Sequence, residues 1–352
     1  MGLAFGGLYP DGNLYDGRIL MLTNKLRIAL ISDNLTHACL SKECQILAVT
    51  PLNYKWVLRF QKPDLLFVES TWEGQRGEWK HKVAAYPNRR WASNKALARV
   101  VSYARDRGIP TVFWNKEDGV HFERFIDSAV LFEHIFTVDE NCISEYRKRV
   151  APDVNVEVLM FPVQTATHFF KGFDFKFHEA NFVGSYSRKI HDGRRRWQDL
   201  MFASCSGAGV KVVVYDRNSN RSSANYRYPD FSQLEVRPSI PHAQTAQVYR
   251  DYCVSLNVNT IEDSPSMYSR RLVEILACGG IAVTNPSEAV NRYFAEYCHV
   301  IVDSLQTTEL LSRLRRGPVK EDLDRAEAGA RYVLDQHNWT RRLNEVRRVV
   351  GI

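Results

Sequence analysis

Short apolar segments that end in polar turns alternate with amphipathic segments along most of this chain of 352 residues. A short apolar run is typical of a buried parallel strand, and the amphipathic segment after it is typical of a crossover helix. The apolar runs form two series. They lie at 26–33, 63–70, 109–115 and 134–139 in the first series and at 180–186, 210–216, 253–259, 280–285 and 298–303 in the second. This pattern predicts an α/β fold with two Rossmann-like, doubly wound domains that face each other across a cleft.

The boundaries of these domains follow from where the alternation starts, pauses and stops. Residues 1–25 lack the basic start and the apolar run of a signal peptide, which predicts a flexible leader. Aromatic and charged residues at 164–179 predict a linker between an N-terminal domain, 26–163, and a C-terminal domain, 180–339. Within the domains, we expect one helix over 35–48, with Thr36 as its N-cap, and a polar loop over 217–231.

The composition is that of a globular protein with an excess of positive charge. Apolar residues make up 45% of the chain, which excludes a mostly disordered protein. The 47 Lys and Arg residues exceed the 40 Asp and Glu residues by seven, which favours anionic partners such as phosphates, nucleic acid or an acidic membrane surface. The seven cysteines are scattered without zinc spacing, so we expect buried free thiols and a cytoplasmic protein. No apolar run is long enough to span a bilayer.

The strongest local motif is SPSMYSRRLVEILACGGIAVTN, residues 264–285. Arg270 and Arg271 stand at the predicted start of a helix, where guanidinium groups and free backbone N–H groups bind phosphate. Glu274 lies one turn further along the same face and can accept hydrogen bonds from ribose hydroxyls. Tyr268 and Ser269 precede the helix and would let its backbone approach a ligand. The alternative is an amphipathic helix with an internal Arg–Glu pair.

A second motif is FVGSYSRKIHDGRRRW, residues 182–197. A strand ends at Gly184, and Ser185, Arg188 and Lys189 follow in the turn before a helix. Positive charge at this place suits a diphosphate. The spacing is not G-x-G-x-x-G, so a dinucleotide-dependent dehydrogenase is not supported. The alternative is a solvated basic helix face.

Acidic groups and a histidine follow two strands of the first series. TVFWNKEDGVHF, residues 111–122, places Glu117, Asp118 and His121 at the carboxyl end of a strand, where a general base is expected. Glu69 leaves the preceding strand toward the same edge. The alternatives are an N-cap role for Asp118 and a structural hydrogen bond from Glu69 to nearby loop amides.

Five segments together resemble the GT-B glycosyltransferases, in particular the CgeB-like group named for a spore maturation protein. They are PDLLFVESTWEG (63–74), GIPTVFWNKED (108–118), FVGSYSRK (182–189), RRLVEILACGGIAVTN (270–285) and HNWTRRL (337–343). The resemblance implies a nucleotide-sugar donor in the C-terminal domain, an acceptor on the N-terminal domain, and a last helix at 340–352 that crosses back. Glu274 matches the ribose-binding second Glu of the E-x7-E motif. The first Glu is replaced by Ser266, for which Asp263 or Glu262 would have to substitute.

The prediction is therefore a metal-independent glycosyltransferase that needs no cofactor besides its nucleotide-diphosphate sugar. One of Arg188 and Lys189 and one of Arg270 and Arg271 would stabilise the leaving diphosphate, with Gly184 and Ser185 giving close backbone approach. Asp118 is the first candidate for the base, followed by Glu117, His121 and Glu69, and in a retaining enzyme Asp118 would only orient the acceptor.

The partners are predicted more broadly. The acceptor is a glycan, a lipid-linked glycan or a modified nucleobase, with nucleic acid permitted by the charge but not favoured. Contact with an anionic membrane at the inner face would use the cations at 313–320 or a C-terminal group: Arg341, Arg342, Arg347 and Arg348. The alternatives are a nucleotide-sugar epimerase or hydrolase on the same fold, and a non-catalytic polyanion-binding protein.

Overall fold

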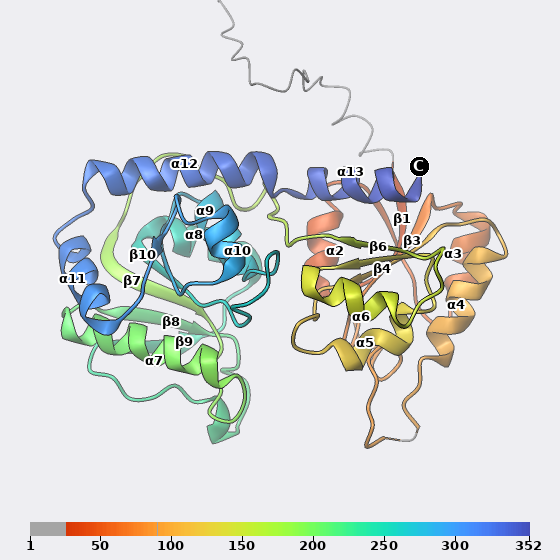
Figure 1. Ribbon diagram of the computed structural model, residues 1–352, viewed down its shortest axis with the longest axis horizontal. Helices are drawn as coiled ribbons and strands as arrows, with labels where there is room; N and C mark the ends of the chain where they lie inside the picture. Colours follow the sequence, from red (N-terminus) through yellow and green to blue (C-terminus); the bar gives the residue numbers. More distant parts are fainter. Residues whose placement is uncertain (1–25, 90) are drawn as a thin grey trace, which may run out of the picture.

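The computed structural model describes residues 26–89 and 91–352, and the predicted leader at 1–25 lies outside these residues. Two α/β domains lie side by side, each built around a six-stranded parallel sheet (Figure 1). Helices cover both faces of each sheet, so nearly every central strand residue is buried. The predicted α/β class with two doubly wound domains is confirmed.

The N-terminal sheet has the strand order β2-β1-β3-β4-β5-β6. Its strands are β1 (Arg27–Ile31), β2 (Gln45–Ala48), β3 (Leu65–Glu69), β4 (Thr111–Asn115), β5 (His134–Thr137) and β6 (Asn155–Val158). Its helices are α2 (Asn34–Leu40), α3 (Tyr54–Phe60), α4 (Lys95–Arg105), α5 (Phe122–Ala129), η1 (Glu140–Cys142) and α6 (Ile143–Arg147).

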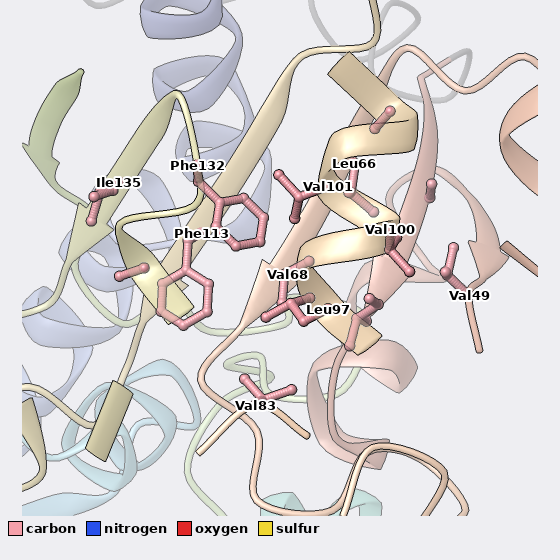
Figure 2. Packing of buried hydrophobic residues seen from close by; sticks show 14 of the residues in the cluster. Val49, Leu66, Val68, Val83, Leu97, Val100, Val101, Phe113, Phe132 and Ile135 are labelled. Atoms are coloured by element: carbon pink, nitrogen blue, oxygen red, sulfur yellow. The ribbon is translucent and has the colours of Figure 1, made fainter. Parts of the chain in front are cut away.

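The packing of α4 on this sheet shows why the segment is helical. Its buried residues, Leu97, Val100, Val101 and Ala104, recur at helical spacing and so form a single apolar face. Figure 2 shows this face against the strand residues Leu66, Val68 and Phe113. Removing such aliphatic side chains from water is the main term that stabilises the domain.

The C-terminal sheet has the strand order β12-β11-β10-β7-β8-β9. Its strands are β7 (Phe177–Gly184), β8 (Val212–Asp216), β9 (Leu234–Pro238), β10 (Tyr252–Asn257), β11 (Ile281–Thr284) and β12 (His299–Val300). Its helices are α7 (Asp192–Gly207), η2 (Ala224–Tyr226), α8 (His242–Asp251), α9 (Arg270–Ala277), α10 (Glu288–Tyr293), α11 (Ser304–Arg315) and α12 (Lys320–Gln336).

The order of the strands locates the expected ligand sites. In the C-terminal sheet the chain order reverses between β7 and β10, and in the N-terminal sheet it reverses between β1 and β3. Ligands of doubly wound sheets bind outside the carboxyl ends of the strands at such reversals. The residues that follow β7, β10, β1 and β3 therefore lie where ligands are expected.

Two predicted elements differ from the structure. The single helix expected over 35–48 is wrong, because α2 ends at Leu40 and Gln45–Ala48 forms the edge strand β2. Thr36 lies inside α2 and not at its N-cap, which is Asp33. The predicted loop 217–231 contains the short helix η2, and β9 follows it.

The end of the chain crosses from one domain to the other. After α12, the helix α13 (Trp339–Val350) lies along the N-terminal domain (Figure 1). Its residues Trp339, Leu343 and Val346 are buried in the core of that domain. Arg342 lies on this buried face, donates to the carbonyl of Met160 and pairs with Glu345. Arg342 is therefore a structural residue, and the prediction that it belongs to a basic membrane-facing surface is wrong.

The sequence predicts buried free cysteines and no apolar run long enough to span a bilayer. All seven cysteines are free and buried, as predicted. Among the described residues, no helix combines the length and the apolar character that a transmembrane span requires.

Candidate functional site

The carboxyl end of β7 packs tightly against the start of α9. A Cβ atom on Gly184 would lie 2.5 Å from Phe182 Cε1 and 2.9 Å from Arg271 Nη2. The Arg271 guanidinium lies over the Phe182 ring, 4.6 Å from its centroid. Only glycine at position 184 leaves room for this cation beside the strand, which places both predicted residues in one site.

Four arginines gather at this reversal of the C-terminal sheet: Arg194 from α7, Arg217 after β8, and Arg270 and Arg271 from α9. Burial and the charge of Arg271 lower the pKa of Arg194 to about 10. Burial also lowers the pKa of Arg271, and loss of water together with Arg270 and Arg271 lowers that of Arg217. A lowered pKa means that the neighbourhood disfavours each positive charge, so an anion bound here would relieve the repulsion.

Several donors in this cluster lack a protein partner. Arg194 Nε, Arg271 Nη1 and the Tyr228 hydroxyl are buried and make no hydrogen bond with the described residues. No carboxylate among those residues forms an ion pair with Arg194, Arg217 or Arg271. Buried polar groups are nearly always satisfied, so these three groups are free to donate to a ligand that carries oxygen acceptors.

Glu274, on the same helix as Arg270 and Arg271, is a carboxylate beside the cluster. Its Oε1 lies 2.7 Å from His242 Nε2 and 3.0 Å from Arg270 Nε. Burial acts to raise the pKa of Glu274, but the Arg270 charge and the His242 hydrogen bond outweigh it and hold the pKa below its usual range. Glu274 is therefore an ionised acceptor next to the anion site, which suits the hydroxyls of a ribose.

His168, His242 and Glu274 together have the spacing of a metal-ligand group, with one ligand atom of each within 4.8 Å of the others. His168 Nε2 lies 2.9 Å from Thr245 Oγ1, whose hydroxyl donates to the His242 carbonyl. His168 must then donate through Nε2, which leaves the unpartnered Nδ1 as an acceptor. The Arg270 charge already balances Glu274, however, so a second cation would meet repulsion.

A small cavity of about 110 Å³ adjoins the arginines, between the turn after β7 and η2. His191, at the N-cap of α7, has a φ of 58°, a left-handed conformation that is uncommon for a residue with a Cβ. The residues that line the cavity are Ser185, Tyr186, Ser187, Ile190, His191, Arg194, Gln198, Asn218 and Tyr226. The predicted Ser185 is thus at the site, although its carbonyl already accepts from Arg194 Nη2 and Gln198 Nε2.

Four other residues predicted for the donor site differ in their surroundings. Arg188 and Lys189 are exposed, and Arg188 Nε donates to the carbonyl of Arg227 on the η2 loop. Tyr268 is buried, with its hydroxyl bonded to the Phe161 carbonyl. The Ser269 N–H donates to Asn259 Oδ1. Tyr268 and Ser269 therefore hold α9 in place, and Arg194 takes the position at the cluster that was expected for Arg188 or Lys189.

The carboxyl edge of the N-terminal sheet is also charged, but its charges are paired. Lys116 Nζ lies 3.1 Å from both Asp33 Oδ2 and Glu69 Oε1. Glu69 accepts from the N–H of Asp33, the N-cap of α2, at 2.6 Å and from the hydroxyl of Thr36 in its first turn at 2.5 Å, so it ties the start of α2 to the end of β3. The structural alternative for Glu69 is what the geometry supports, because the carboxylate is buried and its oxygens are occupied.

Asp118 is fully buried in the same domain. Its oxygens accept from Asn115 Nδ2 at 2.6 Å and from the Tyr146 hydroxyl at 2.9 Å. Burial raises the pKa of Asp118 to about 7. The side chain faces the interior, so it has no path to the proton of an incoming acceptor, and it does not cap α5, which begins at Phe122. Neither sequence interpretation of Asp118 fits this placement.

Glu117 and His121 are the predicted residues that stay partly exposed at this edge. Burial raises the pKa of Glu117, against the opposing effects of Lys116 and of a hydrogen bond from Trp72. Burial and the facing His191 of the C-terminal domain lower the pKa of His121. Trp72 packs edge-on against the His121 ring at 5.3 Å. Glu117 is the accessible carboxylate whose pKa is displaced toward neutrality, which suits a general base.

The residue that replaces the first Glu of the E-x7-E motif joins the two domains. The buried Ser266 donates to the Val138 carbonyl at 3.0 Å and accepts from the Glu140 N–H at 2.8 Å. Ser264 donates to Asp139 nearby. Glu262 accepts from Trp197 Nε1 at 3.0 Å, whereas Asp263 is exposed and its carbonyl accepts from Asn141. Ser266 therefore forms part of the contact between the two domains. Glu262 is the acidic residue that lies against α7.

Sequence reasoning gave no role to three residues of these clusters. Asp33 is the last residue of the predicted strand 26–33, Arg217 directly follows the strand predicted at 210–216, and Tyr228 lies in an irregular segment. The available signal was position, because Asp33 and Arg217 lie at the carboxyl ends of predicted strands, where ligands of such sheets bind.

Comparison with known proteins agrees with this architecture. Residues 193–348 match the family model described as Glycosyl transferase-like. Among curated proteins, none matches the chain.

Solved structures with the same fold are similar over nearly the whole chain. An alpha-glucosyltransferase in complex with UDP and a 13-mer DNA containing a HMU base has a TM-score of 0.63 at 10% identity, with 93% of this chain and 100% of that chain covered. A DNA-modifying beta-glucosyltransferase has a TM-score of 0.57 at 10% identity, covering 93% and 99%. HepE of Anabaena in complex with UDP and glucose has a TM-score of 0.55 at 10% identity, covering 96% of each chain.

The fold is therefore that of the GT-B glycosyltransferases, as predicted. The segment 193–348, which is similar to the Glycosyl transferase-like model, contains the arginine cluster and Glu274. Membership of the CgeB-like group stays a prediction.

Proposed function

We propose that this protein transfers a sugar from a nucleoside-diphosphate donor to a hydroxyl group of an acceptor. The observation that carries the proposal is the group of arginines without carboxylate partners beside the ionised Glu274, at the reversal of a Rossmann-type sheet. In this arrangement the diphosphate lies on Arg194, Arg217 and Arg271, and the ribose donates hydrogen bonds to Glu274. The UDP named for the similar structures supports a uridine diphosphate sugar as the first donor to test.

The same cations supply the chemistry of the donor side. When the glycosidic bond breaks, negative charge grows on the leaving diphosphate, and donors that are already in place stabilise it without reorganisation. Arg271 is held against Phe182 and Gly184, and Arg194 is anchored by the Ser185 carbonyl, so both are fixed before the reaction. We propose that these cations act in place of a divalent metal ion.

On the acceptor side, we propose Glu117 as the group that takes the proton of the attacking hydroxyl. Its carboxylate is partly exposed and its raised pKa brings it closer to that of an effective base. In the polar wall formed by Lys116, Asp33 and Glu69, one ammonium faces two carboxylates, which suits a neutral hydroxyl-bearing acceptor better than an anionic one. The acceptors to compare in the assay are a glycan, a lipid-linked glycan and a modified nucleobase.

A binding screen followed by a turnover assay tests the proposal. Nucleotides that bind the folded state raise the melting temperature, so we expect a selective shift with one of UDP, GDP, dTDP and CMP. Glu274→Gln should remove most of this shift while the melting temperature of the free protein stays near that of the wild type. Absence of a shift with all four nucleotides would contradict the donor site.

The turnover assay separates transfer from the other reactions of such a fold. Release of the nucleoside diphosphate should depend on an added acceptor and should persist in EDTA. Release of the nucleoside diphosphate at the same rate without acceptor would indicate a hydrolase. Conversion of the donor into an isomer without release of the nucleoside diphosphate would indicate an epimerase. A large loss of activity in EDTA would contradict the metal-independent mechanism.

A further inference from the structure

Helix α3 in the N-terminal domain is apolar on two sides. Val57 and Leu58 are buried in the domain core. On the opposite side Trp56 is 56% exposed and Phe60 62% exposed, and Leu52 in the preceding turn is 96% exposed. A surface helix normally keeps polar residues on its outer side, so an apolar outer side indicates that something else covers it.

Cations accompany these apolar side chains. Lys55, Arg59 and Lys62 are all exposed on the same segment, and residues 50–63 contain no Asp or Glu. None of the three forms an ion pair with any residue in the described part of the chain, although Arg59 lies over the Phe60 ring at 5.2 Å. We call these residues the α3 outer face: Leu52, Lys55, Trp56, Arg59, Phe60 and Lys62.

Two other basic segments of the molecule use part of their charge in ion pairs. Of the C-terminal cations expected at a membrane, Arg342 is buried and paired with Glu345. In the segment 313–320, Arg313 pairs with Asp322 and Lys320 pairs with Asp324. The α3 outer face differs because its charges are unpaired and lie beside large exposed apolar groups.

The neighbouring helix extends the positive surface. Tyr54 of α3 packs edge-on against Tyr103 of α4 at 5.5 Å, so the two helices share one side of the domain. Lys95, Arg99 and Arg107 of this region are exposed as well. Figure 1 places α3 and α4 at the end of the N-terminal domain that points away from the C-terminal domain. An occupant of this face would therefore leave the donor site free.

We propose that the α3 outer face binds the surface of an anionic lipid bilayer. Leu52, Trp56 and Phe60 would enter the boundary between headgroups and acyl chains, while the three cations bind lipid phosphates. A second copy of the chain is a poor occupant, because two such faces would bring six cations together without a carboxylate. The protruding apolar stripe, which includes an aliphatic residue, favours hydrocarbon over nucleic acid. The proposal is independent of the donor chemistry.

Sedimentation of the full chain with vesicles tests this proposal. We expect binding to vesicles that contain phosphatidylglycerol, weak binding to phosphatidylcholine alone, and a loss of affinity with rising salt. The pair Trp56→Ser and Phe60→Ser should weaken binding at least about tenfold, because the variant lacks the two large apolar side chains that leave water on binding. The double substitution Lys55→Glu and Arg59→Glu should weaken binding by a similar factor, because it reverses two positive charges of the α3 outer face.

A matched control removes exposed apolar side chains elsewhere. Leu305 and Val302 are 71% and 62% exposed in the C-terminal domain, and Leu305→Ser with Val302→Ser should leave vesicle binding unchanged. The melting temperature of each variant reports whether it is folded. Quenching by brominated lipids gives a second readout, and it should decrease in Trp56→Phe relative to the wild type.

Three results would overturn the proposal. One is vesicle binding that survives both pairs of substitutions. Another is a dimer in sedimentation velocity that the Trp56→Ser and Phe60→Ser pair abolishes, which would assign the face to a second copy. The third is tighter binding to an oligonucleotide than to anionic vesicles, lost in the same variants, which would assign it to nucleic acid.

Discussion

The two sheets of this protein share one architecture but treat charge at their carboxyl edges in opposite ways. In the C-terminal domain, Arg194, Arg217 and Arg271 come together without an acidic partner among the described residues, and burial lowers the pKa of each. In the N-terminal domain, Lys116 is balanced by Asp33 and Glu69. Burial acts to lower the pKa of Lys116, but the charges of these two carboxylates outweigh burial and raise it.

The difference indicates what each edge binds. An uncompensated buried cation costs free energy in the empty protein, and that free energy is recovered when an anion binds. A compensated group is satisfied in the empty protein and gains little from a charged ligand. Under the proposed function, one fold would hold a diphosphate on one side and a neutral acceptor on the other, and the distinction would depend on a few side chains that follow the strands.

The largest effect should come from Glu117→Gln, which tests whether the N-terminal edge takes part in the reaction. Loss of a general base typically lowers turnover by about 10²–10⁴. We expect kcat to fall by this order while the nucleotide-induced thermal shift stays that of the wild type, because Glu117 belongs to the opposite edge from the arginines. The readouts are steady-state kinetics and thermal shift on the same preparation.

Asp118→Asn is the matched control for this prediction. It changes the adjacent carboxylate to its amide at a buried position. Turnover within about tenfold of the wild type is expected, in contrast to the loss of about 10²–10⁴ expected for a general base. The reverse pattern, with Glu117→Gln active and Asp118→Asn inactive but folded, would return the base to Asp118.

The next largest effect concerns the C-terminal domain, where Arg194, Arg217 and Arg271 come together. Arg271→Ala should weaken nucleoside diphosphate binding about 10- to 100-fold, because hydrogen bonds to charged groups contribute on the order of 1.5–3 kcal/mol. The free protein should melt at the same or a higher temperature, since the variant removes a buried cation that repels its neighbours. Isothermal calorimetry and thermal unfolding without ligand measure the two quantities.

Arg331→Ala supplies the control, because it removes one positive charge from the exposed outer side of α12. Nucleotide affinity should not change in this variant. An equal loss in both variants would mean that overall charge, and not the cluster, attracts the nucleotide.

The strands and the local motifs were largely predictable from the sequence, because each depends on neighbouring residues. The buried strand β10 is an apolar run, and the spacing of Arg271 and Glu274 on α9 follows from helix geometry. The edge strand β2 was missed because only one of its four residues is buried, so its apolar signal is weak.

The composition of the site was less predictable, because it depends on contacts between distant segments. Asp118 follows a strand as the base of an enzyme would, but its side chain points to Tyr146, and nothing in the local sequence reports this direction. Arg217 is a single arginine after β8, and only the position of β8 beside β7 brings it to the cluster. Ser266 acquires its role from Val138 and Glu140, which lie in the other domain.

A smaller effect is expected from Gly184→Ala, which tests whether the close packing under the arginines matters. The added Cβ would lie 2.5 Å from Phe182 and 2.9 Å from Arg271 Nη2, so both side chains must shift. Overpacking of this kind costs about 1–3 kcal/mol of unfolding free energy, and the displaced guanidinium should also reduce nucleotide affinity. In the control Gly207→Ala the nearest atom is 3.5 Å away, so neither stability nor affinity should fall.

The smallest effect is the pH dependence of stability that the buried Asp118 causes. Because burial raises its pKa from 3.8 to about 7, the folded state binds the proton more tightly than the unfolded state. The contribution of Asp118 to stability is therefore full below pH 3.8 and is lost as the pH rises toward 7. Asp118→Asn removes this titration, so its melting temperature should fall less steeply than that of the wild type between pH 5 and about pH 7. Identical slopes for the two proteins would show that Asp118 stays ionised in the interior, and the N-terminal edge would then hold a buried negative charge that Tyr146 and Asn115 stabilise by hydrogen bonds alone.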